Sequence, residues 1–259
     1  MRVGAVTLAL RAEGSGPPLL LIHGFPTSGE LWTGVAPRLV GAGFRVLVPD
    51  LLGYGASDAP AQGLDMASQA DCTVELLDAL AIPRVVVVAH DVGTAAALII
   101  AAQAPNQVRG LALIDGVHED RWAIEAIESI RGWDPADAAR LAPLLSRTLR
   151  EPGLSREALS GLLRPYEGSE GGSRLIRAAR ALDPTQTVGY AVRVRRAAIR
   201  SLVLWGDADR YLSLTEVGEP LARDLGAELK VVRGGHFLPL ASPTLVAHEV
   251  VAFVRSLPR

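Results

Sequence analysis

The chain has 259 residues, of which 49% are hydrophobic and 21% charged, so it can bury a large core and is not a disordered protein. Its formal net charge of -2 provides no electrostatic attraction for nucleic acid or for an anionic membrane, and neither partner is expected. The one cysteine, Cys72, excludes an intrachain disulfide and fits a reducing compartment, so we expect a cytoplasmic protein.

Short apolar runs alternate with longer amphipathic stretches from Pro18 onward, and a further strand is expected within the first ten residues. The runs that predict buried strands are Leu19 to Ile22, Phe44 to Val48, Val85 to Ala89, Val108 to Ile114, Ser201 to Trp205 and Leu229 to Val232. Continuous apolar strands joined by helices form parallel sheets that are covered on both faces. The pattern therefore predicts an α/β fold.

This alternation stops between about Gly116 and Ala198, where the chain is helical in pattern and contains five prolines. We expect residues 117–198 to form a helical cap, inserted into a core made of residues 1–116 and 199–259. The run from Gly168 to Gly172 predicts a loop between cap helices. The aromatic residues of the cap that are candidates for lining a pocket are Trp122, Trp133, Tyr166 and Tyr190.

The strongest chemical signal is Asp91, which follows a predicted strand and precedes a predicted helix from Thr94 to Ala104. A tight turn from strand to helix exposes its central side chain at the helix N-terminus, where the dipole and free N–H groups favour an anion. Ala89 and Gly93 supply the small neighbours that such a turn needs. Asp91 is therefore a candidate nucleophile, and the alternative interpretation is an ordinary helix N-cap.

Two other loops could complete a site around Asp91. His23-Gly24-Phe25-Pro26 follows a predicted strand, and the backbone N–H groups of Phe25 and Val92 could bind one oxyanion. His236 lies on a glycine-flanked loop after the last predicted strand and is the candidate general base. The other histidines are interpreted as a loop brace (His23), a strand residue behind the nucleophile (His90), and residues without supporting context (His118 and His248).

Two aspartates compete to orient the imidazole of His236. Asp209 follows the strand after the predicted cap, which gives the chain order nucleophile, acid, histidine. Asp115 ends the preceding strand and is the alternative acid. We favour Asp209 because an aspartate at the end of a strand is also common as a loop initiator.

Taken together, these motifs resemble the α/β-hydrolase superfamily from about Pro18 to the end of the chain. They stand in the family's order as His23 to Pro26, Asp50 to Asp58, the turn at Asp91, Gly206 to Asp209, and Gly235-His236. Aspartate in the nucleophile position resembles the branch that contains haloalkane dehalogenases, haloacetate dehalogenases and epoxide hydrolases. The resemblance implies an eight-stranded, mostly parallel sheet with a helical cap.

An aspartate nucleophile indicates displacement at a saturated carbon through an alkyl-ester intermediate, which His236 and water then hydrolyse. Attack on an ordinary ester would instead form an anhydride, so simple esterase activity is disfavoured. A small-molecule substrate and water are the expected partners, with no cofactor and no metal. The chain is expected to act as a monomer or homodimer.

The leaving group is less clearly indicated than the nucleophile. The Thr27-Ser28 and Ser57-Asp58 segments resemble haloalkane dehalogenases, although Val92 and Phe25 stand where those enzymes usually carry a halide-binding tryptophan and an asparagine. Haloacetate dehalogenases place arginine at the position of Val92, and the Tyr-Arg pair of epoxide hydrolase caps has no match here.

We therefore predict dehalogenation of a small, mostly neutral compound, with the indole N–H of Trp122 or Trp133 as halide donor. Epoxide hydrolysis is the first alternative. Esterase or C–C hydrolase activity and a non-catalytic ligand-binding role are further alternatives, since a fold alone does not prove catalysis.

Overall fold

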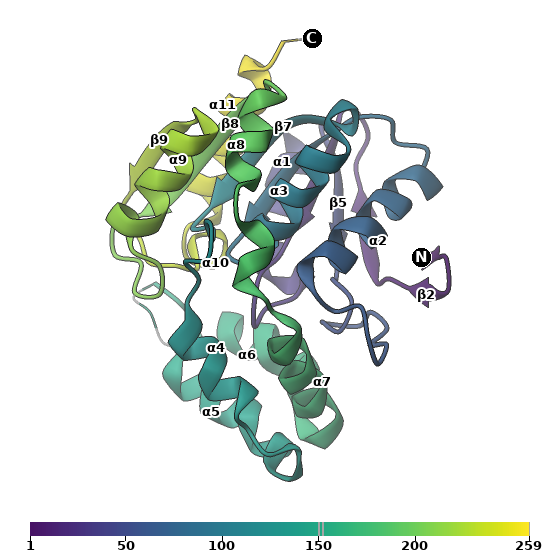
Figure 1. The fold of residues 1–259 in the computed structure, drawn as a ribbon, viewed down its shortest axis with the longest axis vertical. Coiled ribbons are helices and arrows are strands. Elements are labelled where there is room, and N and C mark those ends of the chain that lie inside the picture. The colour runs from purple at the N-terminus through teal and green to yellow at the C-terminus, as the bar shows by residue number, and fades with distance from the viewer. Residues whose placement is uncertain (150, 152, 259) are drawn as a thin grey trace.

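The centre of the protein is a seven-stranded sheet, seen in a computed structural model that describes residues 1–149, 151 and 153–258 (Figure 1). In spatial order its strands are β3 (Leu10–Glu13), β5 (Arg45–Pro49), β4 (Pro18–Ile22), β6 (Val85–His90), β7 (Val108–Ile114), β8 (Ser201–Gly206) and β9 (Glu228–Val232). Strand β3 is antiparallel to β5, and the remaining pairs are parallel. Every residue of β6 and β8 is buried, which explains their unbroken apolar runs.

The sequence-based expectation of an α/β fold is confirmed, but the expected eighth strand is wrong for this sheet. The first residues form β1 (Arg2–Val3) and β2 (Val6–Thr7), which pair only with each other. Gly4 turns the chain between them with a φ of +54°, a conformation that glycine adopts at little cost. The N-terminal run therefore folds back on itself instead of widening the sheet.

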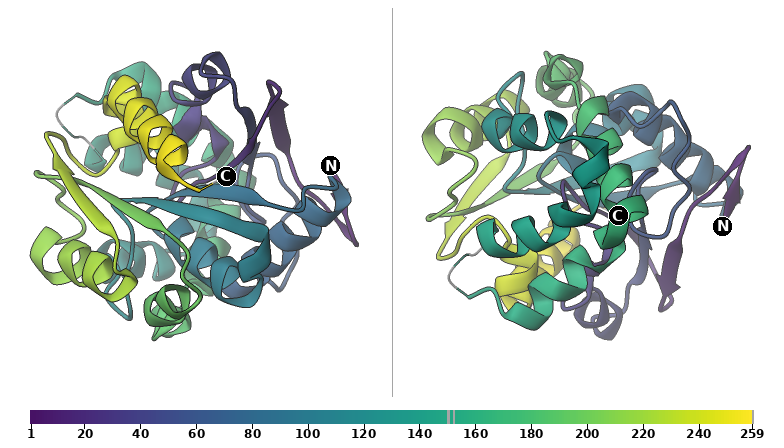
Figure 2. Two further views of the ribbon diagram at one scale, coloured as in Figure 1. Left: turned by 90° about the horizontal axis from the view of Figure 1, so that it is seen from above. Right: turned by 90° about the horizontal axis from the view of Figure 1, so that it is seen from below.

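Helices cover both faces of the sheet, as Figure 2 shows from above. On one face lie α1 (Ala36–Gly41) and α11 (Pro243–Ser256), and on the other lie α2 (Met66–Ala79), α3 (Gly93–Gln103), α8 (Tyr190–Arg196) and α9 (Glu219–Leu225). Helix α3 contains the predicted run from Thr94 except its last residue, Ala104, and its residues from Gly93 to Ala101 are buried. No helix in the described part of the chain is long and apolar enough to cross a membrane.

Between β7 and β8 the described chain is helical and contains no strand of the sheet. Its helices before α8 are α4 (Ile124–Arg131), α5 (Leu141–Thr148), α6 (Arg156–Leu163) and α7 (Gly168–Ala181). Figure 1 shows α4 to α7 beyond one edge of the sheet, the edge at which β6 ends and α3 begins. This placement brings apolar helical side chains opposite the loops that carry the predicted reactive residues.

Short helical turns and one small helix complete the chain. They are η1 (Gly29–Trp32), η2 (Pro105–Gln107), η3 (Pro135–Arg140), η4 (Arg164–Tyr166), η5 (Pro184–Thr187), η6 (Leu214–Gly218) and α10 (Leu238–Ala241). The loop expected from Gly168 to Gly172 is wrong, because these residues begin α7. A Cβ at Gly172 would collide with the carbonyl oxygen of Ala138, so this glycine permits α7 to pack closely on η3.

Candidate active site

The turn between β6 and α3 holds Asp91 in the conformation that the sequence predicts. Asp91 has a φ of +51°, which is uncommon for a non-glycine residue and turns its side chain away from the sheet. Glycines permit the close approach of the neighbouring loop. A Cβ at Gly24 would lie 2.5 Å from the Cβ of Asp91, and one at Gly93 would collide with the carbonyl oxygen of His23. The two loops therefore need small residues where they meet.

The two carboxylate oxygens of Asp91 have different surroundings. Oδ2 accepts a hydrogen bond of 2.8 Å from the backbone N–H of Phe25, and the N–H of Val92 also hydrogen-bonds to the carboxylate. Oδ1 lies 3.7 Å from Nε2 of His236. Burial raises the pKa of Asp91, although His236 and the two N–H donors oppose that rise. Oδ2 thus accepts from Phe25, one of the two predicted oxyanion donors, while Oδ1 lies nearer to His236.

His236 is oriented by Asp209. Its Nδ1 lies 2.8 Å from Oδ2 of Asp209, and the Asp209 side chain is itself held because Oδ1 accepts the backbone N–H groups of Tyr211 and Leu212 at 2.7 and 3.0 Å. Burial lowers the pKa of His236, but the charge and hydrogen bond of Asp209 and the charge of Asp91 outweigh burial and raise the pKa to about 9. The arrangement can hold a proton on Nδ1 and leave Nε2 directed toward Asp91.

Asp115, the alternative acid, has other contacts. Its Oδ1 accepts the backbone N–H of Gly206 at 2.7 Å, and its buried Oδ2 has no hydrogen-bond partner among the described residues. Burial raises the pKa of Asp115 well above its usual range, which favours the protonated, neutral form. The geometry therefore favours Asp209 over Asp115 as the partner of His236.

Two other buried histidines support these loops. Nε2 of His90 donates to the carbonyl oxygen of His236 at 2.8 Å, and the two rings lie 4.7 Å apart. Burial lowers the pKa of His90 well below 6.5, so this ring is neutral. Nε2 of His23 accepts the N–H of Leu51 at 3.0 Å, and its Nδ1 donates to the carbonyl oxygen of Gly24 at 2.9 Å. His23 braces the Phe25 loop, as the sequence predicts.

Asp91 and His236 face a cavity of about 260 Å³. The loops at the edge of the sheet contribute Phe25, Pro26, Asp91, Val92, Tyr211, His236 and Phe237 to its lining. The segment between β7 and β8 contributes Ala123, Ile127, Ser129, Ile130, Trp133, Leu141, Leu144, Leu145 and Leu149. The lining is largely apolar and includes no arginine or lysine among the described residues. Such a cavity suits a neutral organic molecule better than a carboxylate.

Comparison with known proteins agrees with this architecture. Residues 17–243 match the family model described as the alpha/beta hydrolase fold. The chain belongs to the α/β-hydrolase fold family. The chain is an enzyme of the hydrolase class, because it matches this family and its relatives include a dehalogenase and an epoxide hydrolase.

Three relatives describe the similarity in more detail. A haloalkane dehalogenase of Mesorhizobium japonicum is 34% identical over 148 residues, which cover 57% of this chain and 44% of that protein. Bifunctional epoxide hydrolase 2 of Mus musculus is 40% identical over 104 residues, which cover 39% of this chain and 19% of that protein. The crystal structure of haloalkane dehalogenase DbeA from Bradyrhizobium elkani superimposes with a TM-score of 0.80 at 26% identity, covering 98% of this chain and 96% of that one.

The structure corrects the assignment of aromatic residues to the pocket of this α/β hydrolase. Trp133 lines the cavity, but Trp122, Tyr166 and Tyr190 are not among its described lining residues. The hydroxyl of Tyr166 donates to the carbonyl oxygen of Thr27 at 2.6 Å and so joins η4 to the β4 loop. Tyr190 lies on α8, and Cζ of the Arg193 guanidinium lies 4.6 Å from the centre of the Tyr190 ring.

The indole N–H groups that were predicted to bind halide are also engaged elsewhere. Nε1 of Trp122 donates to Oγ1 of Thr187 at 3.1 Å, and Nε1 of Trp133 donates to the carbonyl oxygen of Asp137 at 3.1 Å. The pattern of aromatic residues in the sequence did not reveal these partners, because they come from other turns of the fold.

Two residues near the site have no place in the sequence-based prediction. Tyr211 lines the cavity, with its ring centre 5.2 Å from that of His236. Its position two residues after Asp209, on the loop that carries the acid, was a usable signal. The carboxylate of Glu151 accepts the backbone N–H groups of His236 and Phe237, each at 3.2 Å. Nothing local in the sequence around Glu151 indicates this long-range contact.

Proposed function

We propose that this α/β hydrolase cleaves a carbon–halogen bond at a saturated carbon of a small, neutral substrate through an ester on Asp91. In the first step Oδ1 of Asp91 forms a bond to the carbon, and the halide leaves with the electron pair of the broken bond. Oδ2 stays with the N–H donors of Phe25 and Val92. No cofactor takes part in this displacement.

In the second step the ester is hydrolysed. Nε2 of His236 accepts a proton from water while the water oxygen attacks the carboxyl carbon of Asp91. The negative charge that develops on Oδ2 is stabilised by the N–H groups of Phe25 and Val92. Collapse of this intermediate releases the alcohol with the proton from His236 and leaves Asp91 as a carboxylic acid. Loss of that proton to His236 and then to solvent regenerates the Asp91 carboxylate, so one proton is released for each halide. Asp209 stabilises the imidazolium ion that forms between these two events.

The observation that carries this proposal is that the two carboxylate oxygens of Asp91 have different contacts. Oδ2 accepts the N–H of Phe25 at 2.8 Å, and Oδ1 lies 3.7 Å from Nε2 of His236, which lines the cavity together with Asp91. This arrangement presents a nucleophilic oxygen and leaves the histidine to act on water afterwards. An ordinary N-cap aspartate has no need of the buried His236–Asp209 pair.

The cavity lining favours neutral substrates over haloacetates, because the described lining residues provide no cation to bind a carboxylate. A departing halide still needs a hydrogen-bond donor, since an unpaired anion in an apolar cavity is costly. Tyr211 lines the cavity, and its phenol O–H replaces the two tryptophans as the candidate donor. The hydroxyls of Thr27 and Ser57 are engaged elsewhere, because they donate to the carbonyl oxygens of Gly24 and Asp50.

Epoxide hydrolysis is the second candidate function, and the observation that favours it is again Tyr211. Opening an epoxide requires an acid for the departing oxygen. Tyr211 is the one tyrosine among the described lining residues, so Tyr166 and Tyr190 are no longer the residues to test. Replacing Tyr211 by phenylalanine should abolish diol formation if the phenol is that acid.

The division into a catalytic core of residues 1–116 and 199–259 and a cap of residues 117–198 is part of this proposal. Its support is that the reactive groups come from the core while cavity-lining aliphatic side chains come from the helical segment. Arg174 joins the two, because its Nη1 donates to the carbonyl oxygens of Gly55 and Ser57 at 3.0 and 3.1 Å. A cytoplasmic location and a monomer or homodimer stay predictions.

Trapping the ester tests the proposal and identifies the leaving group. The His236→Gln variant should form the Asp91 ester without hydrolysing it. Intact mass spectrometry after incubation with haloalkanes and epoxides separates the alternatives. An alkyl halide adds its alkyl group in exchange for one hydrogen, whereas an epoxide adds its whole mass.

The Asp91→Asn,His236→Gln double variant is the matched control and should give no adduct. Adducts that persist in the double variant would show that another nucleophile reacts. The non-catalytic alternative would be the better interpretation if the wild-type enzyme converts no haloalkane, epoxide or ester and if no adduct is trapped.

A further inference from the structure

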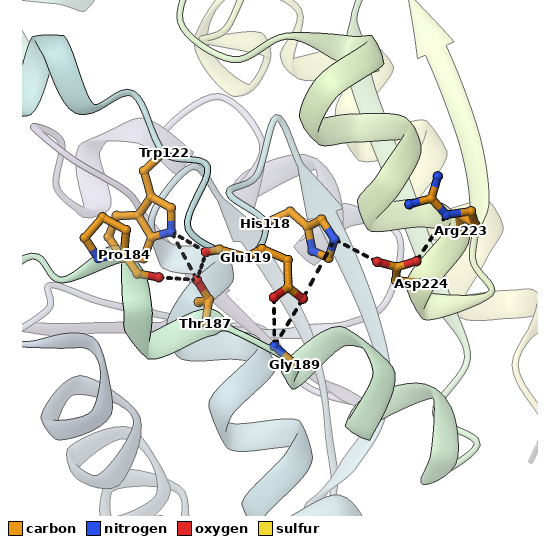
Figure 3. Close-up of polar contacts among 8 residues, drawn as sticks. All are labelled: His118, Glu119, Trp122, Pro184, Thr187, Gly189, Arg223 and Asp224. Carbon is orange, nitrogen blue, oxygen red and sulfur yellow. Dashed lines mark hydrogen bonds and ion pairs between the residues drawn. The ribbon is translucent and has the colours of Figure 1, made fainter.

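A second group of titratable side chains lies outside the cavity, where the sequence predicts no metal site (Figure 3). Nε2 of His118 lies 3.0 Å from Oδ2 of Asp224 and 4.0 Å from Oε1 of Glu119. One potential ligand atom from each of the three residues lies within 4.8 Å of the other two. An imidazole and two carboxylates directed at one point form a donor set that divalent transition metals accept.

Hydrogen bonds from other parts of the chain orient the carboxylates of Glu119 and Asp224. The backbone N–H of Gly189 donates to both carboxylate oxygens of Glu119, at 3.1 and 3.0 Å. Nε of Arg223 donates to Oδ1 of Asp224 at 3.2 Å and leaves Oδ2 directed at His118. The hydroxyl of Thr187 donates to the carbonyl oxygen of Glu119. Outer contacts of this kind fix the orientation of metal ligands and are costly to remove from metal sites.

The accessibility of the group suits an ion that enters from solvent. The His118 side chain is 3% exposed, whereas the carboxylates of Glu119 and Asp224 are each 28% exposed. They open onto a surface depression that Arg121 and Thr215 also line. A buried imidazole with solvent-accessible carboxylates leaves space for water as a further ligand.

We propose that His118, Glu119 and Asp224 bind a divalent transition metal ion, with Nε2, Oε1 and Oδ2 as the protein ligands. Tetrahedral zinc at about 2.0–2.2 Å from its ligands requires ligand atoms roughly 3.4 Å apart. The separations of 3.0 and 4.0 Å from Nε2 lie on either side of that value, so small side-chain rotations suffice. The imidazole favours zinc over magnesium, which prefers oxygen ligands.

The ion would connect two parts of the chain, and the hydrogen bond from Gly189 to Glu119 joins a third part to the site. His118 and Glu119 follow β7 and precede α4, Gly189 precedes α8, and Asp224 lies on α9. The site therefore lies where the helical segment leaves the sheet and where it returns. The role of the ion is structural, because it would hold the segment after β7 and the segment before α8 against α9. This role does not depend on the chemistry proposed for Asp91.

The ordinary alternative is a His118–Asp224 ion pair without metal, and titration with metal ions distinguishes the two. The full-length protein, first treated with EDTA and then freed of the chelator, is titrated with zinc chloride by calorimetry at pH 7.5. We expect one saturable zinc per chain, a higher melting temperature with zinc, and at least about tenfold weaker binding of magnesium.

Variants locate the ion. His118→Gln and Asp224→Asn should each weaken zinc binding at least about tenfold, because each removes one ligand. His248→Gln is the matched control, since His248 is an exposed histidine beside the carboxylate of Glu249 and should bind zinc as the wild type does. His236→Gln should also retain binding, which separates this site from the candidate active site.

Asp224→His separates metal binding from the ion pair. Nδ1 of the new imidazole can occupy the place of Oδ2, so a metal ligand is kept while the carboxylate partner of His118 is lost. Zinc binding should persist in this variant and fail in Asp224→Asn. The proposal is overturned if the wild type binds no zinc, if His118→Gln binds it equally well, or if only His236→Gln abolishes binding.

Discussion

The two sides of the cavity differ in chemistry. The loops at the edge of the sheet contribute a carboxylate, an imidazole and aligned backbone N–H groups, all held by short hydrogen bonds. The segment between β7 and β8 contributes mostly aliphatic side chains from α4 and α5, together with Trp133. We call these the sheet side and the helical side of the cavity.

This difference has a physical reason. Apolar side chains on the helical side exclude water, and a less polar surrounding strengthens the interaction of Asp209 with His236 and of the N–H donors with Asp91. Carboxylates and imidazole need such partners to be buried at all. The comparison predicts that substitutions on the sheet side change the chemical steps, whereas those on the helical side change the choice of substrate.

The largest expected effect follows from Asp91→Asn on the sheet side. Turnover should fall at least about 10³-fold, because an amide is a poor nucleophile, while the melting temperature stays close to that of the wild type. Steady-state kinetics and thermal unfolding measure the two effects. Unchanged turnover, once mass spectrometry has excluded deamidation to aspartate, would remove Asp91 from the mechanism.

The next effect distinguishes the two acids. Asp209→Asn should slow ester hydrolysis by about 10²–10⁴-fold and ester formation much less, because only the second step needs the base. Asp115→Asn should keep turnover within about threefold of wild type, since a neutral amide replaces a carboxyl group that burial already keeps neutral. Single-turnover kinetics separates the steps. The reverse pattern would make Asp115 the acid.

A pH profile tests the charge balance on the sheet side. His236 must be neutral to act as a base, and its pKa is raised to about 9, so ester hydrolysis should increase about tenfold per pH unit below that pKa. The rate should level off below pH 9, because the ester lacks the negative charge of Asp91 that helps to raise the pKa of His236 in the free enzyme. In Asp209→Asn the plateau should move to still lower pH. A flat profile between pH 6 and 9 would contradict this role of His236.

The smallest effect concerns the helical side. Trp133→Ala enlarges the cavity and should raise kcat/KM for longer substrates relative to shorter ones by about tenfold. Trp122→Phe is the control, because it removes the hydrogen bond to Thr187 outside the described cavity lining and should cost about 1 kcal/mol of stability without altering substrate preference. Kinetics over a series of chain lengths checks both. An equal shift in preference from both substitutions would mean that the helical side acts through stability alone.

Local patterns in the sequence were sufficient for the parallel sheet and for the turn at Asp91. Unbroken apolar runs reflect strands buried on both faces, and small residues beside Asp91 reflect a close approach of two backbones, so each leaves a trace within a few residues. Chain order also indicated Asp209 and His236. By contrast, the first residues failed to predict the edge of the sheet, because apolar alternation does not state which strand a segment will pair with.

Tertiary structure decided which side chains from distant segments meet. Trp122, Trp133, Tyr166 and Tyr190 look alike in the sequence, yet of these four only Trp133 is among the described lining residues of the cavity. Tyr211 reaches the cavity wall, and Glu151 reaches the loop of His236 from a helical segment far away in the chain. The reason is that periodicity identifies the buried face of a helix, but the direction in which that face packs depends on long-range contacts.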